Sequence, residues 1–306
     1  MTSVVGAIRL GTRASRLAGV QTEMVRKALA RLNRTIEFRS VELTTEGDRD
    51  RRTPLPEIGG KGVFTQELEQ ALREGTIDLA VHSLKDVPVE PTPGLTLAAI
   101  GMREDPREVW ISARGWTLAT IPAGAKVGTC STRRAAQLLV HRPDLRLASL
   151  RGNVDTRIAK VQAGEFDAIV IAAAGVHRLG LTSAITEYLP LEVMLPAPGQ
   201  GALAVQCRAD DSAMRDLLRR LDDTAVRSAT DAERAFLEGL GGGCAAPIAA
   251  FGEVTGDRLY LRGLVLSRDG KRQLRLAGKV RWTEARLLGL TLAAEALAKG
   301  AEALLP

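Results

Sequence analysis

The sequence Ile77-Asp78-Leu79-Ala80-Val81-His82-Ser83-Leu84-Lys85-Asp86-Val87-Pro88 decides the fold that we predict for this chain. Its first half is a short apolar run, which is typical of a buried strand. The run ends in Lys85 and Asp86, and Pro88 cannot continue a strand ladder because it lacks an amide N–H. Open α/β sheets bind ligands beyond their strand ends, so the pattern predicts a Lys-Asp pair at a ligand-binding edge. A surface ion pair that closes the strand is the alternative interpretation.

A strand, a turn and a helix are expected before this stretch. The strand covers residues 7–10, the turn runs from Gly11 to Ser15, and a second strand follows at 37–43. The helix has a 3.6-residue apolar pattern, formed by Leu17, Val20, Met24, Ala28 and Leu32. A turn that places Arg13 and Ser15 at a helix N-terminus favours an anion. Taken by itself, a plain helix cap by Thr12 or Ser15 is the simpler explanation.

The same order of elements recurs between residues 125 and 172. A strand, a Gly-Thr turn and a helix start at 125–134 are followed by a strand at 145–150, a helix and a strand at 166–172. This repeat predicts two similar α/β domains that face each other across a cleft. The first copy differs by an insertion at 49–62, which is charged and rich in Gly and Pro. We interpret the insertion as a lid with Lys61 in its tip.

Arginine residues stand at the expected strand ends of both copies. A guanidinium group binds a carboxylate or phosphate through two parallel hydrogen bonds, so this pattern predicts a cleft for a polyanion. A solvated basic face fits less well, because these arginines occupy turns while the helices carry mixed charge. The arginines are Arg13, Arg133, Arg134, Arg151, Arg157 and Arg178.

A third unit is expected after a segment at 195–205 that crosses back to the first domain. It begins near Ala225 and contains a helix at 231–240, a strand at 248–254, a hairpin and a closing helix at 284–298. Cys244 follows three glycines beyond the first helix, which suits a flexible tether better than core packing. The predicted fold is therefore α/β, with two lobes around a cleft and a smaller C-terminal α+β domain. The predicted domains are 1–101 with 202–219, 107–195, and 224–306.

Composition limits the class of protein. The chain has 306 residues, of which 45% are hydrophobic and 25% charged, and a net charge of +6, which indicates a globular protein with an anionic partner. Its three cysteines are too few and too scattered for a disulfide framework or a zinc ribbon, and we expect no metal. No apolar run reaches membrane-spanning length, so we expect a cytoplasmic protein. The three histidines are expected to be non-catalytic, with His82 structural and His141 and His177 on the surface.

Several motifs together resemble the porphobilinogen deaminase (hydroxymethylbilane synthase) family, in order and nearly from end to end. They are Gly11-Thr12-Arg13-x-Ser15, Gly59-Gly60-Lys61-Gly62, Val81-His82-Ser83-Leu84-Lys85-Asp86-Val87-Pro88, Arg103-Glu104-Asp105-Pro106-Arg107, Ser149-Leu150-Arg151-Gly152-Asn153 and Gly242-Gly243-Cys244-x-x-Pro247. The resemblance implies two lobes like those of periplasmic anion-binding proteins, and a smaller α+β domain. It also implies a transferase that condenses four porphobilinogen molecules on a covalent dipyrromethane primer, with release of ammonia at each step. Hydrolysis then releases hydroxymethylbilane, a precursor of haem.

The resemblance assigns roles to individual residues. Asp86 matches the catalytic aspartate, and Cys244 matches the cysteine that carries dipyrromethane through a thioether. Positions that hold the cofactor match Lys85, Ser131, Arg133, Arg134 and Arg157. Positions for incoming substrate or the growing chain match Arg13, Ser15, Arg151, Arg178, Gln21 and Gln200. A carboxylate near the pyrrole nitrogens suits this chemistry, because coupling creates positive charge there.

Two other classes of protein share some of these features. A two-lobed binding protein for a polycarboxylate anion would share the lobes, but it has no use for Asp86 or Cys244. A nucleic-acid binder would explain the basic charge, yet the arginines sit in paired turns with few aromatic residues for stacking. We therefore expect a monomer without nucleic-acid or membrane partners, which makes at most transient contact with the next enzyme of the pathway.

Overall fold

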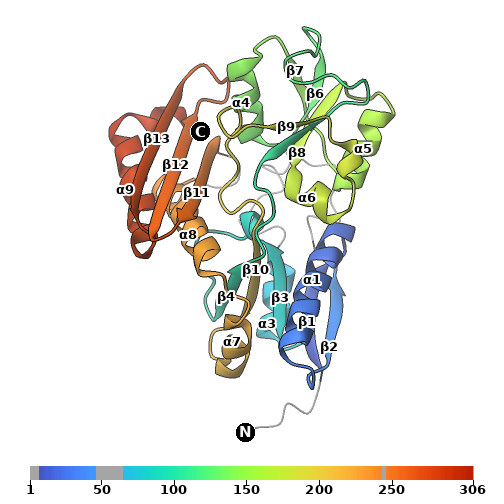
Figure 1. Ribbon diagram of the computed structural model, residues 1–306, viewed down its shortest axis with the longest axis vertical. Coiled ribbons are helices and arrows are strands. Elements are labelled where there is room, and N and C mark those ends of the chain that lie inside the picture. The colour runs from blue at the N-terminus through green and yellow to red at the C-terminus, as the bar shows by residue number, and fades with distance from the viewer. Residues whose placement is uncertain (1–6, 46–64, 243–245, 306) are drawn as a thin grey trace.

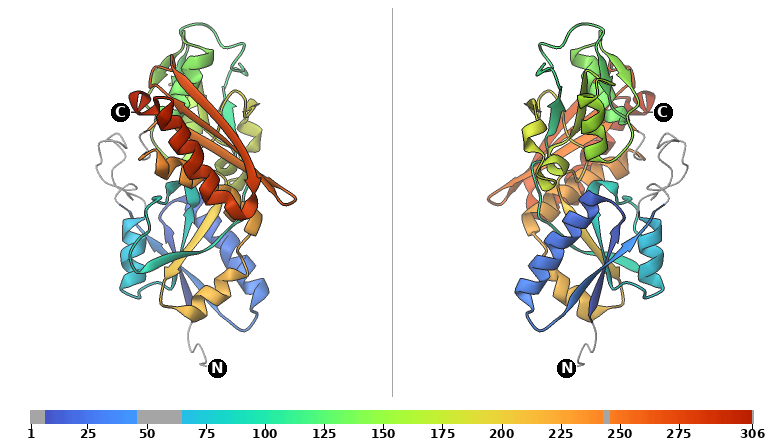
Figure 2. Two further views of the ribbon diagram at one scale, coloured as in Figure 1. Left: turned by 90° about the vertical axis from the view of Figure 1, so that its left-hand side faces the viewer. Right: turned by 90° about the vertical axis from the view of Figure 1, so that its right-hand side faces the viewer.

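Three β-sheets with flanking helices form the computed structural model, which describes residues 7–45, 65–242 and 246–305 (Figure 1). The first lobe occupies one end of the molecule, and the second lobe and the third domain lie side by side at the other (Figures 1 and 2). Among the described helices, none combines the length and the apolar character that are needed to cross a lipid bilayer.

The first lobe is built on a five-stranded sheet in the order β2-β1-β3-β10-β4. Strands β2, β1 and β3 are parallel, and β10 runs antiparallel to both of its neighbours. Buried apolar residues of helices α1 and α7 pack on one face of the sheet, and those of α3 on the other. The elements are β1 (Ile8–Arg13), α1 (Arg16–Leu32), β2 (Phe38–Leu43), α3 (Gln66–Arg73), β3 (Leu79–Ser83), β4 (Leu95–Gly101), β10 (Leu203–Arg208) and α7 (Ser212–Arg219).

The second lobe repeats this topology with the strand order β7-β6-β8-β5-β9. Strands β7, β6 and β8 are parallel, and β5 takes the antiparallel position that β10 holds in the first lobe. The repeat that the sequence predicts is therefore confirmed. The elements are β5 (Glu108–Ile111), β6 (Lys126–Gly128), α4 (Thr132–His141), β7 (Arg146–Ala148), α5 (Val154–Gln162), β8 (Ala168–Ala172), α6 (Ala173–Arg178) and β9 (Glu187–Leu189).

Two crossing segments connect the lobes and lie against each other. The first, residues 102–107, joins β4 to β5, and the second, residues 190–202, joins β9 to β10. The amide of Glu104 donates to the Gly201 carbonyl at 3.1 Å, and Arg103 Nε donates to the Gln200 carbonyl at 3.2 Å. Each lobe therefore receives its antiparallel strand directly from a crossing segment.

The third domain is an antiparallel sheet in the order β11-β12-β13, covered on one face by α8 and α9. Its other face packs against α4 and the second crossing segment through Ala136, Leu195 and Leu264. The elements are α8 (Thr224–Gly239), β11 (Ile248–Thr255), β12 (Arg258–Leu266), β13 (Gln273–Arg281) and α9 (Ala285–Ala298), with short 3-10 helices at Trp282–Glu284 and Ala301–Leu304. A further 3-10 helix, Thr182–Ala184, lies in the second lobe between α6 and β9. The predicted architecture of two α/β lobes and a smaller α+β domain is confirmed, while the limits of the three domains stay a prediction.

Glu233 of α8 joins the third domain to both crossing segments. Its fully buried carboxylate pairs with Arg103 at 2.8 Å and accepts hydrogen bonds from the amides of Gly199, at 2.6 Å, and Gly252, at 2.8 Å. Burial raises the pKa of Glu233, and the Arg103 charge and the two amides oppose that rise. A carboxylate that pairs with one cation and accepts from two amides, in three parts of the chain, fixes their relative positions.

The structure corrects the sequence prediction for helix α1. Strand β1 continues through Gly11 and Thr12, so these two residues do not form the turn. The residues that α1 buries are not the predicted apolar face: they are Ala18, Gln21, Thr22, Val25 and Leu29. Because two of these buried residues, Gln21 and Thr22, are polar, a search for apolar periodicity does not find this face. Leu17, which was expected on the buried face, packs near Gly175 in α6 of the other lobe.

Helix α8 also differs from its prediction, because it begins at Thr224 rather than at Asp231. Asp223 caps the helix by accepting hydrogen bonds from the amides of Ala225 and Val226. An aspartate side chain in this position satisfies amides that the first helical turn leaves without partners, and this fixes the earlier start.

Gly201 tests the packing of the two crossing segments. It has φ +89°, and a Cβ at this position would clash with the backbone of Glu104. We expect Gly201→Ala to lower the free energy of unfolding by about 3 kcal/mol or more, from backbone strain and overpacking combined. Gly115→Ala is the control, since Gly115 has φ +69° but open space around it, and it should cost about 1 kcal/mol. Equal losses in urea titrations of both variants would contradict this account.

Candidate functional site

The end of strand β3 places Lys85 and Asp86 beside the crossing segments. The strand is buried through Leu79 to His82, and the chain then turns through a 3-10 helix at Leu84–Asp86. Leu84 anchors this turn, because its side chain is fully buried and its amide donates to the Ala202 carbonyl at 3.0 Å. The predicted strand that stops at a Lys-Asp pair is confirmed.

Asp86 is half-buried and makes no hydrogen bond with the part of the chain that the structure describes. Its negative charge acts on Lys85, whose pKa it raises. A carboxylate that is held on a short turn without a hydrogen bond from the described residues is available to a ligand.

Lys85 points into a cluster of charged groups between the lobes. Its Nζ donates to Gln200 Oε1 of the second crossing segment at 3.1 Å. Burial and, to a smaller extent, the charges of Arg134 and Arg133 lower the pKa of Lys85 to about 8, against the opposing charges of Asp86 and Glu108. Lys85 therefore remains a cation at neutral pH but loses its charge at mildly alkaline pH.

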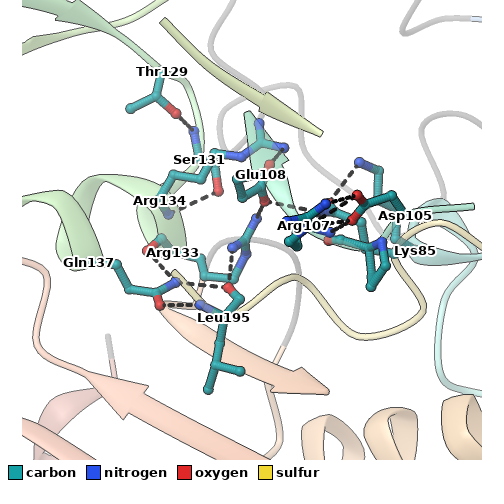
Figure 3. Close-up of polar contacts among 12 residues, drawn as sticks. Lys85, Asp105, Arg107, Glu108, Thr129, Ser131, Arg133, Arg134, Gln137 and Leu195 are labelled. Carbon is teal, nitrogen blue, oxygen red and sulfur yellow. Dashed lines mark hydrogen bonds and ion pairs between the residues drawn. The ribbon is translucent and has the colours of Figure 1, made fainter. Parts of the chain in front are cut away.

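Glu108, the first residue of β5, lies at the centre of this cluster (Figure 3). Its fully buried carboxylate pairs with Arg133 Nη2 and, at 2.8 Å, with Arg134 Nη2, and it accepts a hydrogen bond from Gln200 Nε2 at 3.0 Å. Burial alone would raise the pKa of Glu108, but the charges of Arg134, Arg133 and Lys85 hold it well below its usual range. We use the name interlobe cluster for Lys85, Asp86, Glu108, Arg133, Arg134 and Gln200.

Helix α4 supplies the two arginines of the cluster, and Ser131 determines where the helix begins. The Ser131 hydroxyl caps the helix by accepting from the Arg134 amide at 3.4 Å, and in the first lobe Ser15 caps α1 through the Ala18 amide at 3.2 Å. The simple capping interpretation of Ser15 therefore fits its contacts. Arg13, the last residue of β1, lies close enough to His82 for its charge to lower the pKa of that imidazole.

Three further arginines, Arg151, Arg157 and Arg178, lie around the cluster. Arg157 Nε donates to the Gly152 carbonyl at 2.7 Å, and burial, together with the charges of Arg134 and Arg151, lowers the pKa of Arg157. Arg178 Nη2 donates to the carbonyls of Met102, at 2.9 Å, and Gly201, at 2.7 Å, so it joins the two crossing segments. Burial lowers the pKa of Arg178 to about 10.

The structure thus brings most of the predicted site residues together. Lys85, Arg133, Arg134 and Arg157 are linked through their mutual electrostatic interactions, and Gln21 reaches the end of β3 through Ser83 at 2.9 Å. Cys244 and Lys61, with the predicted lid, lie outside the described residues.

The sequence analysis did not identify Glu108 and Gln137 as site residues. For Glu108 a signal was available, because a glutamate directly before the apolar run Val109-Trp110-Ile111 is unusual at the start of a buried strand. Gln137 Nε2 donates to the Leu195 carbonyl, and Gln137 Oε1 accepts from the Leu195 amide.

The three histidines make structural contacts. His82 is buried and bonds Gln206 at 3.1 Å, and burial lowers its pKa to about 4, so it stays neutral. His141 is exposed, as predicted. His177 is not a surface residue: it is half-buried between Glu104, at 3.2 Å, and the Tyr188 hydroxyl, at 2.8 Å.

Two buried guanidinium nitrogens, one in the interlobe cluster and one beside it, lack an acceptor. Arg134 Nε and Arg178 Nε have no hydrogen-bond partner, although both are removed from solvent. A buried donor without an acceptor is costly, and a carboxylate would satisfy it. Within the described ranges, no group of His, Cys, Asp and Glu side chains could hold a metal ion.

Two similar lobes, joined by paired crossing segments around a cationic cluster, define a two-lobed α/β protein that carries a third domain. The sequence matches the family model "porphobilinogen deaminase, dipyromethane cofactor binding domain" over residues 8–216, and the C-terminal domain model of the same family over residues 228–298. The chain belongs to the porphobilinogen deaminase family.

Curated relatives cover almost the whole chain. A porphobilinogen deaminase from Roseiflexus sp. (strain RS-1) is 50% identical over 296 residues, which are 97% of this chain and 97% of the relative. A porphobilinogen deaminase from Geobacter sulfurreducens is 47% identical over 300 residues, which are 97% of this chain and 93% of the relative.

Solved structures with a similar arrangement of lobes are more distant. The substrate binding domain of a putative molybdenum ABC transporter from Clostridium difficile has a TM-score of 0.45 and 12% identity, over 71% of this chain and 92% of that chain. A probable amino-acid ABC transporter extracellular-binding protein from Bacillus subtilis has a TM-score of 0.45 and 14% identity, over 71% and 90%. Nothing about function follows from a likeness at this level.

His82 provides a test of the electrostatics of the site. Because its pKa is about 4 in the folded protein and about 6.5 in an unfolded chain, the unfolded chain takes up the proton first as the pH falls. Stability is therefore lost between about pH 6.5 and about pH 4, and we expect a loss of about 2 kcal/mol between pH 7.5 and pH 5 from this group. Urea titrations at both pH values should show a loss smaller by that amount in His82→Gln. Equal losses in the two proteins would contradict a buried neutral His82.

Proposed function

We propose that this protein is an active porphobilinogen deaminase, a transferase of tetrapyrrole biosynthesis that condenses four porphobilinogen molecules into hydroxymethylbilane with loss of ammonia. The observation that carries the proposal is the interlobe cluster, in which the Asp86 carboxylate, without a hydrogen bond from the described part of the chain, lies beside a group of buried cations. Each pyrrole ring carries an acetate and a propionate, so a lengthening chain needs many cationic partners. The match to both domains of the family supports the same assignment.

Dipyrromethane, the primer of the family, supplies the free pyrrole carbon to which the first porphobilinogen is added. Its carboxylates fit the described residues, because Arg134 Nε is a buried donor that lacks an acceptor and Lys85 Nζ remains cationic at neutral pH. We propose that the cofactor is held by Lys85, Ser131, Arg133, Arg134 and Arg157. Arg133 has its two terminal nitrogens engaged by Glu108 and Leu195, so it contributes mainly to the charge of the site.

Asp86 is the proposed catalytic residue. Loss of ammonia and ring coupling both place positive charge on pyrrole nitrogens, and a nearby carboxylate stabilises this charge and accepts the proton that is released. The absence of a hydrogen bond to Asp86 from the described residues leaves both of its oxygens for this task. Burial around it strengthens the interaction, because the local dielectric constant is lower than that of water.

The substrate and the growing chain are proposed to contact residues on both lobes. Arg178 joins the crossing segments through one nitrogen and keeps Nε unsatisfied, which suits a carboxylate. Gln200 bonds Lys85, Pro106 and Glu108, so it would orient the site as well as line it. The proposed set is Arg13, Ser15, Arg151, Arg178, Gln21 and Gln200.

The finer assignments rest on the family resemblance alone. We propose that Cys244 carries the dipyrromethane through a thioether, that the enzyme acts as a monomer in the cytoplasm, and that it contacts the next enzyme of the pathway only transiently. The motif that contains Cys244 falls within the residues that match the C-terminal family model.

Asp86→Asn tests the catalytic role. The amide keeps the size of the side chain but cannot stabilise a cation or accept a proton, so we expect a loss of kcat of about 10²-fold or more with normal cofactor loading. Asp78→Asn is a matched control, since Asp78 lies on the same stretch but pairs with Arg9 at 2.8 Å. Near-normal kcat in Asp86→Asn would remove this residue from the catalytic role.

The mass of the intact denatured protein tests both the function and the attachment site. We expect the parent protein to exceed its polypeptide mass by one dipyrromethane, located by peptide mapping at Cys244, and Cys244→Ala to show the polypeptide mass. Cys207→Ala is the control, since Cys207 is buried in the first lobe, and it should retain the adduct. A parent protein that stays at the polypeptide mass after incubation with porphobilinogen would leave a two-lobed anion-binding protein instead.

A further inference from the structure

Glu108 connects the second lobe to the second crossing segment through one buried carboxylate. It begins β5, directly after the first crossing segment, and none of its surface reaches solvent. One oxygen accepts from Arg133 Nη2 and from Gln200 Nε2, and the other faces Arg134 Nη2 at 2.8 Å. The carboxylate therefore touches α4 of the second lobe and the second crossing segment at the same time.

The two adjacent arginines that meet Glu108 are held in different ways. Arg133 is engaged by the protein at both terminal nitrogens, since Nη1 donates to the Leu195 carbonyl at 2.6 Å and Nη2 meets Glu108. Arg134 meets Glu108 through Nη2, while its buried Nε has no partner. Glu108 thus holds one end of the Arg134 guanidinium and leaves a donor available to an anion.

A chain of hydrogen bonds also runs from Glu108 through Gln200 to Lys85, which lies in the 3-10 helix at Leu84–Asp86. Gln200 Nε2 donates to Glu108 and to the Pro106 carbonyl, at 2.8 Å, which fixes the orientation of its side-chain amide. The amide oxygen is thereby directed at Lys85 Nζ, which donates to it at 3.1 Å. Lys85 precedes Asp86, so the position of the lysine ammonium beside the proposed catalytic carboxylate depends on the acceptor that Glu108 offers to Gln200.

We propose that Glu108 is a positioning residue, which aligns Arg134 directly and Lys85 through Gln200 so that both meet carboxylates of the cofactor next to Asp86. This inference rests on the proposed function. The competing explanation is that Glu108 only neutralises Arg133 and stabilises the lobe junction. That role predicts a loss of stability without a specific change in catalysis.

Two substitutions of Glu108 distinguish these explanations in the holoenzyme. Glu108→Gln keeps the size of the side chain but removes the charge and presents an amide donor toward the arginines. Glu108→Asp keeps the charge and withdraws it by one methylene group. Glu233→Gln is the matched control, because it removes an equally buried carboxylate that pairs with Arg103 at the same junction but does not touch the interlobe cluster.

The first readouts are kcat, KM and cofactor loading by intact mass. We expect Glu108→Gln to lose about 10²-fold in kcat, as misplaced catalytic groups do, and to carry dipyrromethane in a smaller fraction of molecules. Glu108→Asp should recover most of the loading and part of kcat. Glu233→Gln should lose stability while its cofactor loading remains that of the parent protein.

The pH dependence of kcat supplies a readout that a merely structural role would not move. The charged groups that act on Lys85 are Arg133, Arg134, Asp86 and Glu108, and the last two raise its pKa. Removal of the Glu108 charge lowers that pKa further, so the alkaline loss of activity should move to lower pH by about one unit in Glu108→Gln. Glu108→Asp and Glu233→Gln should keep the parent profile.

Each remaining outcome overturns either this inference or the proposed function. Parent values of kcat, loading and pH profile in Glu108→Gln would exclude a positioning role. A fall in kcat that is uniform with pH and equal to that of Glu233→Gln, with full loading, would show that the role is structural. If Glu108→Gln does not fold, Glu108→Asp with parent kcat and KM would also exclude the proposal. A parent protein without dipyrromethane would refute the proposed function before any variant is compared.

Discussion

The buried carboxylate of Glu108 is the interaction on which the centre of this protein depends. Lysine and arginine side chains removed from water are each costly by several kcal/mol, and packed together they also repel one another. Glu108 places a negative charge between Arg133, Arg134 and Lys85, and its pKa stays low because those cations surround it. Five cations, Lys85, Arg133, Arg134, Arg151 and Arg157, face two carboxylates, Glu108 and Asp86, so the site keeps an excess of positive charge for an anionic ligand.

The two lobes share a topology but contribute different chemistry. In both, a serine caps the helix that follows the first parallel strand, Ser15 in α1 and Ser131 in α4. The corresponding third strands then end differently: β3 leads into the turn that carries Lys85 and Asp86, whereas β8 leads directly into α6 and Arg178. A duplicated scaffold thus presents a carboxylate from one side and mostly guanidinium groups from the other. Glu233 holds the third domain to both crossing segments, next to this asymmetric site.

Sequence patterns were sufficient for the elements whose burial is apolar. The run at residues 77–81 and its counterpart at 166–172 predicted β3 and β8, and the repeated order predicted two lobes of one topology. The same reasoning failed for α1, because Gln21 and Thr22 are buried and an apolar pattern does not detect polar burial. It also missed Glu108, whose role depends on Arg133, Arg134 and Gln200 meeting it from distant parts of the chain. Ion pairs and hydrogen bonds between residues far apart in the sequence form only in the tertiary structure, so the periodicity of a single helix or strand does not predict them.

Strand β10 has a consequence for the order in which the protein folds during synthesis. It lies between β3 and β4 in the first sheet, yet it is made only after every strand of the second lobe has been completed. A nascent chain that ends before residue 203 has β4 without its neighbour and leaves an edge of β3 open, whereas the second lobe, continuous from Glu108 to Leu189, already has all five of its strands. Domains usually fold from the N-terminus onward as they leave the ribosome. In this chain the second lobe is the first whose sheet can be completed. Until β10 has been synthesised, the sheet of the N-terminal lobe keeps an unpaired strand edge that other chains can bind.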